Sequence, residues 1–271
     1  MEKIVTNSNA EYHSGEGVSK SDLDNINKCP AIYRYYKENP SEETAALLFG
    51  TAVHKLILEP DKFYEEYAIE PICDKRTKEG KAVYSQWLDE NKGKVVISQQ
   101  DYEIAAAMRT AVESNPRAAM LLNGGTTETS YYWIDAETGE ICKCRPDKFN
   151  HGYIIDLKTT ADASPDGFSK SAYAYRYHVQ AAWYIDGIRT VTNEEPKGFV
   201  FIAVEKKPPY AVGIYICDEM MIDLGRKDAR RNLLELHECK IRDTWYGYGG
   251  ESEKIMPISL PAWAAKNGGI K

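Results

Sequence analysis

The stretch CRPDKFNHGYIIDLKTT, residues 144–160, constrains the fold more than any other part of the sequence. Its second half carries the β-branched and aromatic residues that favour a strand. Because successive side chains of a strand point to opposite faces, Ile155 and Leu157 lie on one face. Asp156 and Lys158 lie on the other. The pattern therefore predicts a half-buried strand whose apolar face joins a core while its charged face lines a cleft.

A second carboxylate is expected to approach this strand. A tight hairpin turn at residues 151 and 152 would place Asp147 opposite Asp156, with Cβ atoms about 5 Å apart. Two carboxylates this close repel each other unless a divalent cation lies between them, and their hard oxygens suit Mg²⁺, with Mn²⁺ as the alternative. Lys158 could then orient a water or stabilise charge on a phosphate. From spacing alone, a structural ion pair between Lys158 and Asp156 stays open.

The remaining sequence predicts helices first and a sheet afterwards. Capping residues, apolar spacing and prolines indicate N-terminal helices over residues 19–40, with an interruption at Pro30, and over residues 41–60 and 98–116. Strands are predicted over residues 127–135, 140–149, 152–160, 198–207 and 210–217, and further helices over 169–188 and 218–243. This order is typical of a mixed α/β fold, with a central mixed β-sheet flanked by helices and an N-terminal helical segment.

The chain contains no Ser/Gly-rich or Pro-rich linker, which favours one domain. We expect a single domain over residues 1–271, with an N-terminal extension (1–18), a helical part (19–120), a part with the catalytic sheet and helices (121–245) and a tail (246–271). Apolar runs of the length of a membrane span and a signal-peptide core are both lacking, so we expect a soluble intracellular protein.

Four separated phrases of the sequence resemble one nuclease family. Pro146-Asp147 followed by Asp156-Leu157-Lys158 is similar to the PD-(D/E)XK nuclease signature. The surroundings resemble the RecE-type phage recombination exonucleases, the nuclease domain of exodeoxyribonuclease VIII, in the phrases GTAVHKLILEP, TETSYYWIDAETGEICKCRPDKF, IIDLKTTADASPDGFSKSAYAYRYHVQAAWYIDGI and FVFIAVEKKPPYAVGIY. These phrases follow the family's order and span roughly residues 19–240. The resemblance implies a restriction-endonuclease-like core.

The resemblance also implies a reaction centre when it is carried over residue by residue. The implied metal ligands are His54 of GTAVH, Asp147, Asp156 and the backbone carbonyl of Leu157, and the implied catalytic cation is Lys158. For His54 the alternative is a histidine packed inside a helical bundle. Against that alternative, Gly50 lies one turn earlier and would allow close approach of the catalytic strands or of DNA.

Further residues near these motifs are candidates for DNA contacts. Gln180 and Tyr184 look like the family's Q-x3-Y motif, which implies that Gln180 lies near the scissile strand while Tyr184 and Arg176 contact phosphate or bases. On one helix they would continue a stripe with Tyr173 and Tyr177, for which plain aromatic packing stays open.

Three more candidates come from the flanks of the catalytic strands. Glu128 matches a family acid before the first hairpin strand and is expected to bind a second metal or position DNA, with a surface acid as the alternative. Thr159 and Thr160 could hydrogen-bond a phosphate, although loop turn chemistry explains the same hydroxyls.

The cysteines bear on relatives within the superfamily. All six are scattered without a CxxC pair, which favours reduced thiols over disulfides or a zinc site. Cys29-Pro30 is similar to the start of CRISPR-associated iron–sulfur nucleases, but these need three further clustered cysteines near the C-terminus, and Cys217 and Cys239 stand far apart. We therefore expect no iron–sulfur cluster.

The resemblance implies a metal-dependent exonuclease that degrades linear double-stranded DNA from 5′ to 3′ and leaves 3′ single strands for recombination by strand annealing. It implies a RecT-like phage annealing protein as partner, and a ring-shaped homo-oligomer, expected to be a tetramer, that surrounds DNA ends. A phage or prophage gene expressed in the bacterial cytoplasm follows from the same resemblance. A ring with a basic channel would reconcile DNA binding with the formal net charge of -7.

Other functions stay open. One is an endonuclease or single-strand nuclease of the same superfamily, which circular DNA would reveal. Another is a DNA-binding relative without activity, against which the joint presence of His54, Asp147, Asp156 and Lys158 argues. A structural protein whose ion pairs mimic the motif is the last alternative.

Overall fold

The computed structural model describes residues 2–39, 44–252 and 254–261. The chain forms two compact units, the first from residues 1–20 and 42–231 and the second from residues 21–41 and 232–271. The single domain expected over residues 1–271 stays a prediction. Of the expected tail, residues 246–271, residue 253 and residues 262–271 lie outside the described residues.

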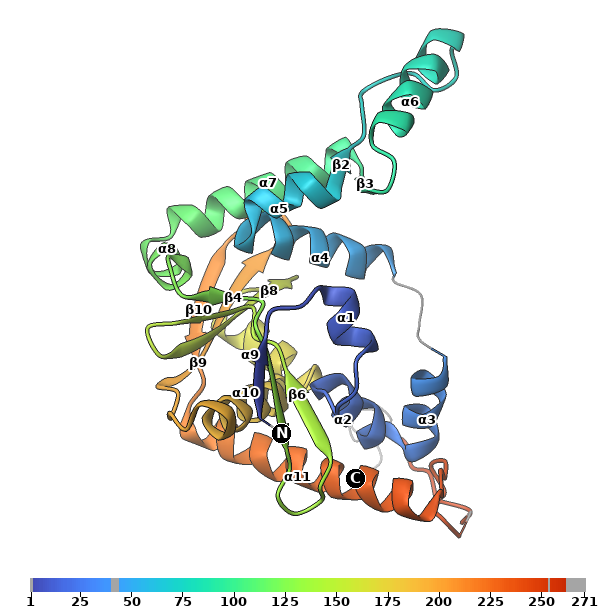
Figure 1. The fold of residues 1–271 in the computed structure, drawn as a ribbon, viewed down its shortest axis with the longest axis vertical. Coiled ribbons are helices and arrows are strands. Elements are labelled where there is room, and N and C mark those ends of the chain that lie inside the picture. The colour runs from blue at the N-terminus through green and yellow to red at the C-terminus, as the bar shows by residue number, and fades with distance from the viewer. Residues whose placement is uncertain (1, 40–43, 253, 262–271) are drawn as a thin grey trace, which may run out of the picture. The chain divides into compact units, whose positions relative to one another are not determined.

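A five-stranded mixed sheet organises the first unit (Figure 1). Its strands, in spatial order, are β10 (Val212–Ile216), β9 (Gly198–Glu205), β8 (Tyr153–Thr160), β7 (Lys148–Asn150) and β4 (Thr126–Thr127). β8 and β9 run parallel, with Asp156 opposite Phe201, and the other neighbours are antiparallel. Together with the surrounding helices, this sheet confirms the predicted mixed α/β class.

The parallel strands β8 and β9 are connected by two helices where the sequence predicted one over residues 169–188. These are α9 (Pro165–Ala174) and α10 (Tyr177–Thr192). The break falls at Tyr175 and Arg176, and Arg176 has a left-handed backbone with φ of 54°. Tyr173 therefore lies on a different helix from Tyr177, and the predicted four-residue stripe is wrong on this point.

A smaller sheet contains β1 (Lys3–Val5), β5 (Ser130–Ile134) and β6 (Ile141–Cys144) in the order β1-β5-β6. The β5–β6 hairpin was predicted, but the strand predicted over residues 140–149 is divided between the two sheets as β6 and β7. Pro146 lies in the link between them. Because proline has no N–H to donate to a ladder, pairing stops there and the chain changes sheet.

Helices from residues 45–122 cover one face of the five-stranded sheet. They are α4 (Ala45–Leu58), α5 (Pro60–Glu66), α7 (Gln99–Ser114) and α8 (Pro116–Leu122). Their buried side chains, among them Val53, Leu56 and Met108, join one apolar cluster with Ile155 and Leu157 of β8. Each such side chain stabilises the fold by about 1.5–3 kcal/mol when fully buried. This packing turns the opposite face of β8, with Asp156 and Lys158, toward the site.

The prolines of this region act at both ends of helices. Pro116 was predicted to stop the third helix, and it does follow the end of α7. It also occupies the first turn of α8, where its missing N–H has no partner to lose, and the Asn115 side chain caps the same helix. Capping by Asn115 and Pro116 therefore explains why a separate helix, α8, follows α7, which was not predicted.

Several short elements were not predicted. Among them are β1, α1 (Asn9–Ser14) and the parallel pair β2 (Tyr67–Ile69) and β3 (Val95–Ile97), and the longer α6 (Lys78–Glu90) was not predicted either. In contrast, α2 (Lys20–Lys28) and α3 (Pro30–Glu38) break at Pro30 as predicted. In the second unit, Tyr33 of α3 stacks on Trp245, which follows α11 (Glu219–Arg242), with ring centroids 5.6 Å apart.

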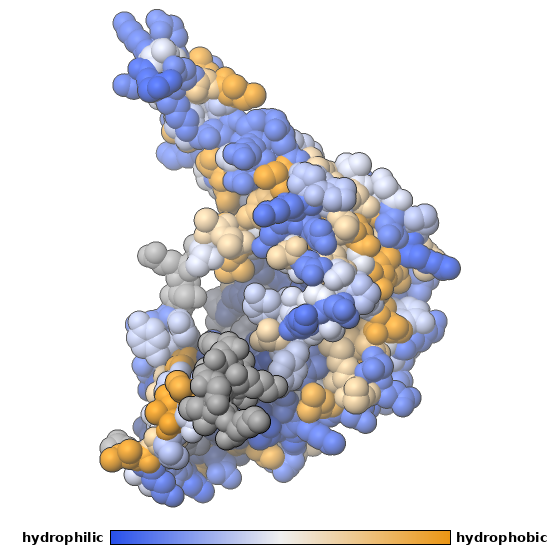
Figure 2. Space-filling model, turned by 180° about the vertical axis from the view of Figure 1, so that it is seen from behind, coloured by the Kyte–Doolittle hydropathy of each residue, from blue (hydrophilic) through white to orange (hydrophobic). Residues whose placement is uncertain are grey.

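Among the described residues, no helix combines the length and apolar character needed to cross a membrane. On the face drawn in Figure 2, hydrophilic residues are interspersed with separate groups of hydrophobic ones.

Candidate active site

The β7–β8 hairpin brings the two predicted carboxylates together. His151 and Gly152 both have positive φ, 53° and 84°, as a two-residue hairpin turn requires. The register pairs Lys148 with Ile155, so its continuation by one residue sets Asp147 opposite Asp156. Asp147 Oδ2 accepts a hydrogen bond from the backbone N–H of Leu157 at 2.7 Å. The expected hairpin geometry is therefore present.

His54 reaches the same point from α4. Its Nδ1 lies 3.3 Å from Asp147 Oδ2. Burial lowers the pKa of His54, but the charge of Asp147, its hydrogen bond to His54 and the charge of Asp156 together outweigh burial, so the pKa is raised. In turn, burial alone would raise the pKa of Asp147, but His54, Lys158 and the Leu157 N–H lower it. His54 is therefore paired with Asp147 and is not simply packed inside a helical bundle.

Asp156 is the most enclosed charge of the site, with 1% of its surface exposed. Its Oδ1 accepts a hydrogen bond from Gln180 Nε2 at 2.5 Å, and its Oδ2 lies 2.5 Å from Lys158 Nζ. Burial and the charge of Asp147 raise the pKa of Asp156 to about 6, although Lys158 opposes them. Burial would lower the pKa of Lys158, but the two carboxylates raise it, so this amine stays protonated.

The residues around Asp156 include groups that could hold a divalent cation. Within the described ranges, no three His, Cys, Asp or Glu side chains are arranged to hold a metal ion by themselves. However, Mg²⁺ usually keeps several waters and is held by one or two carboxylates together with substrate phosphates. Asp156 Oδ2 is buried and, despite its contact with Lys158, makes no hydrogen bond of acceptable geometry to the described residues. A buried carboxylate oxygen beside a second carboxylate is the kind of ligand that such a cation takes.

Comparison with known proteins agrees with this geometry. Residues 19–256 match the family described as PDDEXK-like domain of unknown function (DUF3799). The chain belongs to this PDDEXK-like family. No curated protein matches the sequence. A similar solved structure is the crystal structure of a candidate exonuclease from Eubacterium rectale, with a TM-score of 0.65 and 15% identity over 97% of this chain and 99% of that one. At this identity the likeness concerns the fold.

Glu128 lies beside the carboxylate pair of the PDDEXK-like domain. Its backbone, in the left-handed region with φ of 49°, donates an N–H to the carbonyl of Asp147 at 3.1 Å. Its side chain is 23% exposed and lies 2.7 Å from Nε of Arg145. Burial and the charge of Asp147 raise the pKa of Glu128 to about 7. Glu128 is therefore a half-buried acid of the site rather than an isolated surface acid.

Arg145 was not singled out from the sequence. Its side chain is 7% exposed, and its Nε and one terminal nitrogen make no hydrogen bond of acceptable geometry to the described residues. Its guanidinium lies 5.8 Å from the centre of the Tyr12 ring. The only sequence signal was its place directly before Pro146-Asp147, and nothing in that position distinguishes it from a surface cation.

The structure gives the two threonines different local surroundings, and their hydrogen bonds to a phosphate stay a prediction. Thr160 Oγ1 donates to the carbonyl of Asp162 and accepts from its N–H, which is the turn chemistry left open by the sequence. Thr159 alternates with Thr160 along β8 and so shares a face with Leu157, away from Asp156. The PDDEXK-like domain thus does not bring Thr159 to the carboxylates.

Gln180 and Tyr184 both lie on α10 in the PDDEXK-like domain. Gln180 contacts Asp156 directly, as described above. Tyr184 is 9% exposed and packs edge-on against Phe199, with ring centroids 6.0 Å apart. Burial, together with the charges of Asp156 and Asp147, raises the pKa of its hydroxyl. Tyr184 therefore combines packing with proximity to the site, and its contact with DNA stays a prediction.

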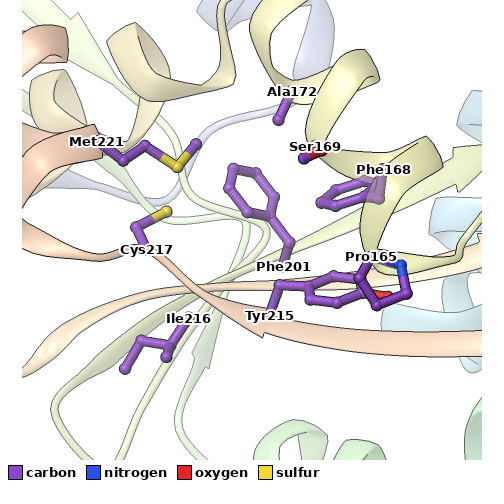
Figure 3. A pocket seen from close by; sticks show the side chains of 9 residues that line it. All are labelled: Pro165, Phe168, Ser169, Ala172, Phe201, Tyr215, Ile216, Cys217 and Met221. Carbon is purple, nitrogen blue, oxygen red and sulfur yellow. The ribbon is translucent and has the colours of Figure 1, made fainter.

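Behind the site lies a small apolar pocket (Figure 3). It has a volume of about 140 Å³ and is lined by Pro165, Phe168, Ser169, Ala172, Phe201, Tyr215, Ile216, Cys217 and Met221. Small-molecule sites usually enclose about 300–1,000 Å³ and add convergent polar groups. Phe168 and Phe201 also contact Tyr177. The pocket thus belongs to the aromatic layer that supports Tyr177.

Proposed function

We propose that this PDDEXK-like domain is a metal-dependent exonuclease of the RecE type that degrades linear double-stranded DNA from 5′ to 3′. The observation that carries the proposal is the carboxylate pair of partly exposed Asp147 and buried Asp156, with Lys158 held against Asp156. Hydrolysis of a phosphodiester needs an oriented water and stabilisation of the charge that develops on the phosphate. A protonated lysine beside two converging carboxylates supplies groups for both.

The contacts of each residue suggest its role in phosphodiester hydrolysis. Mg²⁺, or Mn²⁺ in its place, would be held by Asp147 and Asp156, with His54 and the Leu157 carbonyl as further ligands, and would lower the pKa of a bound water. Lys158 would stabilise negative charge on the phosphate, which its protonated amine supports. Gln180 fixes the rotamer of Asp156 through its amide. Glu128 would serve a second metal or the DNA strand.

The biological setting rests on the family resemblance of the sequence. The product would be a 3′ single-stranded overhang used in recombination by a RecT-like phage annealing protein. Subunits would assemble as a ring-shaped tetramer around the DNA end. The gene would belong to a phage or prophage and act in the bacterial cytoplasm. No iron–sulfur cluster takes part in this proposal.

The test compares linear duplex DNA, labelled at either end, with a closed circle of the same sequence in Mg²⁺. We expect loss of the 5′ label first, an intact circle, and no cleavage by Lys158→Ala or Asp156→Asn. Lys170→Ala is the matched control, because Lys170 is an exposed lysine of α9 that contacts none of these groups. Nicked circles would replace the proposal by an endonuclease. Binding without cleavage in any divalent metal would replace it by a DNA-binding protein.

A further inference from the structure

An exposed tyrosine stands at the break between α9 and α10. Tyr175 is 63% exposed. It ends α9, and Arg176 after it adopts the left-handed conformation that begins α10. A left-handed backbone is strained for a residue other than glycine and is held in place by the structure around it.

Tyr175 continues a stack of rings that starts at Lys158. The Lys158 amine lies 4.8 Å from the centre of the Tyr177 ring. Tyr177 stacks on Tyr175 with centroids 5.8 Å apart and ring planes at 26°. The inner end of this stack is supported by Phe168 and Phe201. An aromatic surface thus runs from the lysine that contacts Asp156 to solvent, and its last member is open.

Positive charge accompanies the rings. Lys20 Nζ donates to the carbonyl of Tyr175 at 2.8 Å and lies 6.0 Å from the Tyr177 ring centre. Arg176 separates the two tyrosines in the chain. Exposed aromatic faces flanked by cations are the combination by which proteins hold single-stranded nucleic acid, because bases stack on the rings while phosphates meet the charges.

We propose that Tyr175 is a stacking platform for an unpaired nucleobase close to the scissile phosphate. This inference rests on the proposed nuclease function and narrows its substrate to a DNA strand whose bases are unpaired where it enters the site. A base inside a duplex has both faces covered by its neighbours, so its face reaches Tyr175 only after the end has frayed or as part of an overhang. Tyr175 then acts as a binding residue that selects opened ends.

The test is a thermodynamic cycle between the ring and one base. The substrate is a DNA hairpin with a short unpaired end, which fixes the register, and a series of such hairpins carries one abasic position each. Affinity is measured in EDTA, so that no cleavage occurs. We expect one position at which base removal weakens wild-type binding about tenfold. Tyr175→Ala should bind the intact DNA about tenfold more weakly and be insensitive to base removal there.

Two further variants separate stacking from other effects. Tyr175→Phe keeps the ring and should retain wild-type affinity and base dependence. Tyr173→Ala is the matched control, because Tyr173 is 73% exposed on the same helix but stacks on His178 instead of Tyr177. It should behave as wild type.

Each outcome decides the inference. A wild-type protein without a sensitive position, or a Tyr175→Ala variant that keeps the sensitivity, overturns it. The cycle needs no hydrolysis, so it is independent of the cleavage test. Coupling between the Tyr175 ring and a base without DNA cleavage would support the stacking role and overturn the proposed nuclease function. Cleavage without such coupling would support the nuclease function and overturn the stacking role.

Discussion

Gln180 of α10 donates its side-chain amide to Oδ1 of Asp156 on β8, at 2.5 Å and inside the protein. The helix that connects β8 to β9 thereby holds the carboxylate that β8 presents. The other oxygen of Asp156 faces Lys158. Each oxygen of the Asp156 carboxylate thus contacts a different residue, Gln180 or Lys158, and the two contacts together fix its orientation.

Gln180→Ala should lower kcat/KM by about 10–100-fold, as expected when a residue that orients a ligand is removed. Loss of the amide also removes a hydrogen bond to the charged form of Asp156, so the pKa of Asp156 rises further. The acidic limb of the pH–rate profile should therefore move to higher pH. His178→Asn on the same helix disrupts the pair with Asp228 and should cost stability without moving that limb. An unmoved limb in Gln180→Ala would show that the contact is only structural.

Metal binding should release protons near neutral pH. The pKa values of Asp156 and Glu128 are raised to about 6 and about 7, mainly by burial. Mg²⁺ competes with these protons, so its affinity should rise with pH until both acids are ionised. Calorimetry at about pH 6 in two buffers of different ionisation heat should reveal the released protons. Buffer-independent heats would contradict the expectation.

The metal-free protein should lose stability over the same pH range. A carboxyl group whose pKa is higher in the folded than in the unfolded chain binds its proton more tightly when folded. The contribution of Asp156 and Glu128 to stability is therefore largest at low pH and is lost as pH rises from about 4 to about 7. Thermal melts in EDTA would show a falling midpoint, and added Mg²⁺ should reverse the fall.

Two helix glycines should respond in opposite ways to alanine. In the part of the chain that the structure describes, no atom lies within 4 Å of a Cβ built at Gly50, so the expected close approach of the strands is not seen there. Gly50→Ala should stabilise the protein by about 0.5–1 kcal/mol. A Cβ at Gly225 of α11 would lie 2.0 Å from the carbonyl of His178, and Gly225→Ala should destabilise by about 1–3 kcal/mol. Urea unfolding measures both. Weaker DNA binding by Gly50→Ala would show that the open space receives DNA.

Lys143 should hold the segment before residue 19, which lies outside the family match. Its buried amine donates to the carbonyls of Tyr12 and Gly15, at 2.6 Å each. Lys143→Met removes both bonds and should destabilise by about 1–3 kcal/mol for each carbonyl left without a donor. A protease that cleaves after glutamate should then cut faster after Glu16. Lys170→Met removes an exposed lysine of α9, outside this segment, and should leave the rate unchanged.

The β7–β8 hairpin was predictable because the sequence features that define it lie within a few residues of each other. Alternation in β8 and the turn at His151-Gly152 together define the pairing of Asp147 with Asp156. The helix break at Tyr175 was not predictable, because neither glycine nor proline marks it and the left-handed residue is Arg176. β1 was missed because three residues are too few to show a period. Arg145 was missed because burial of an arginine depends on tertiary neighbours.

The parallel pairing of β8 with β9 has a consequence for the order of folding. β7 and β8 are adjacent in the chain and can pair through a two-residue turn, whereas β9 reaches β8 only after both crossover helices have been made. Contacts between distant segments form slowly because their loop-closure entropy comes first. A chain still emerging from the ribosome could therefore already have Asp147 and Asp156 paired in the hairpin. It would still lack the hydrogen bond that Gln180 donates to Asp156. We expect the capacity to cut DNA to be acquired last, when the whole sheet is complete.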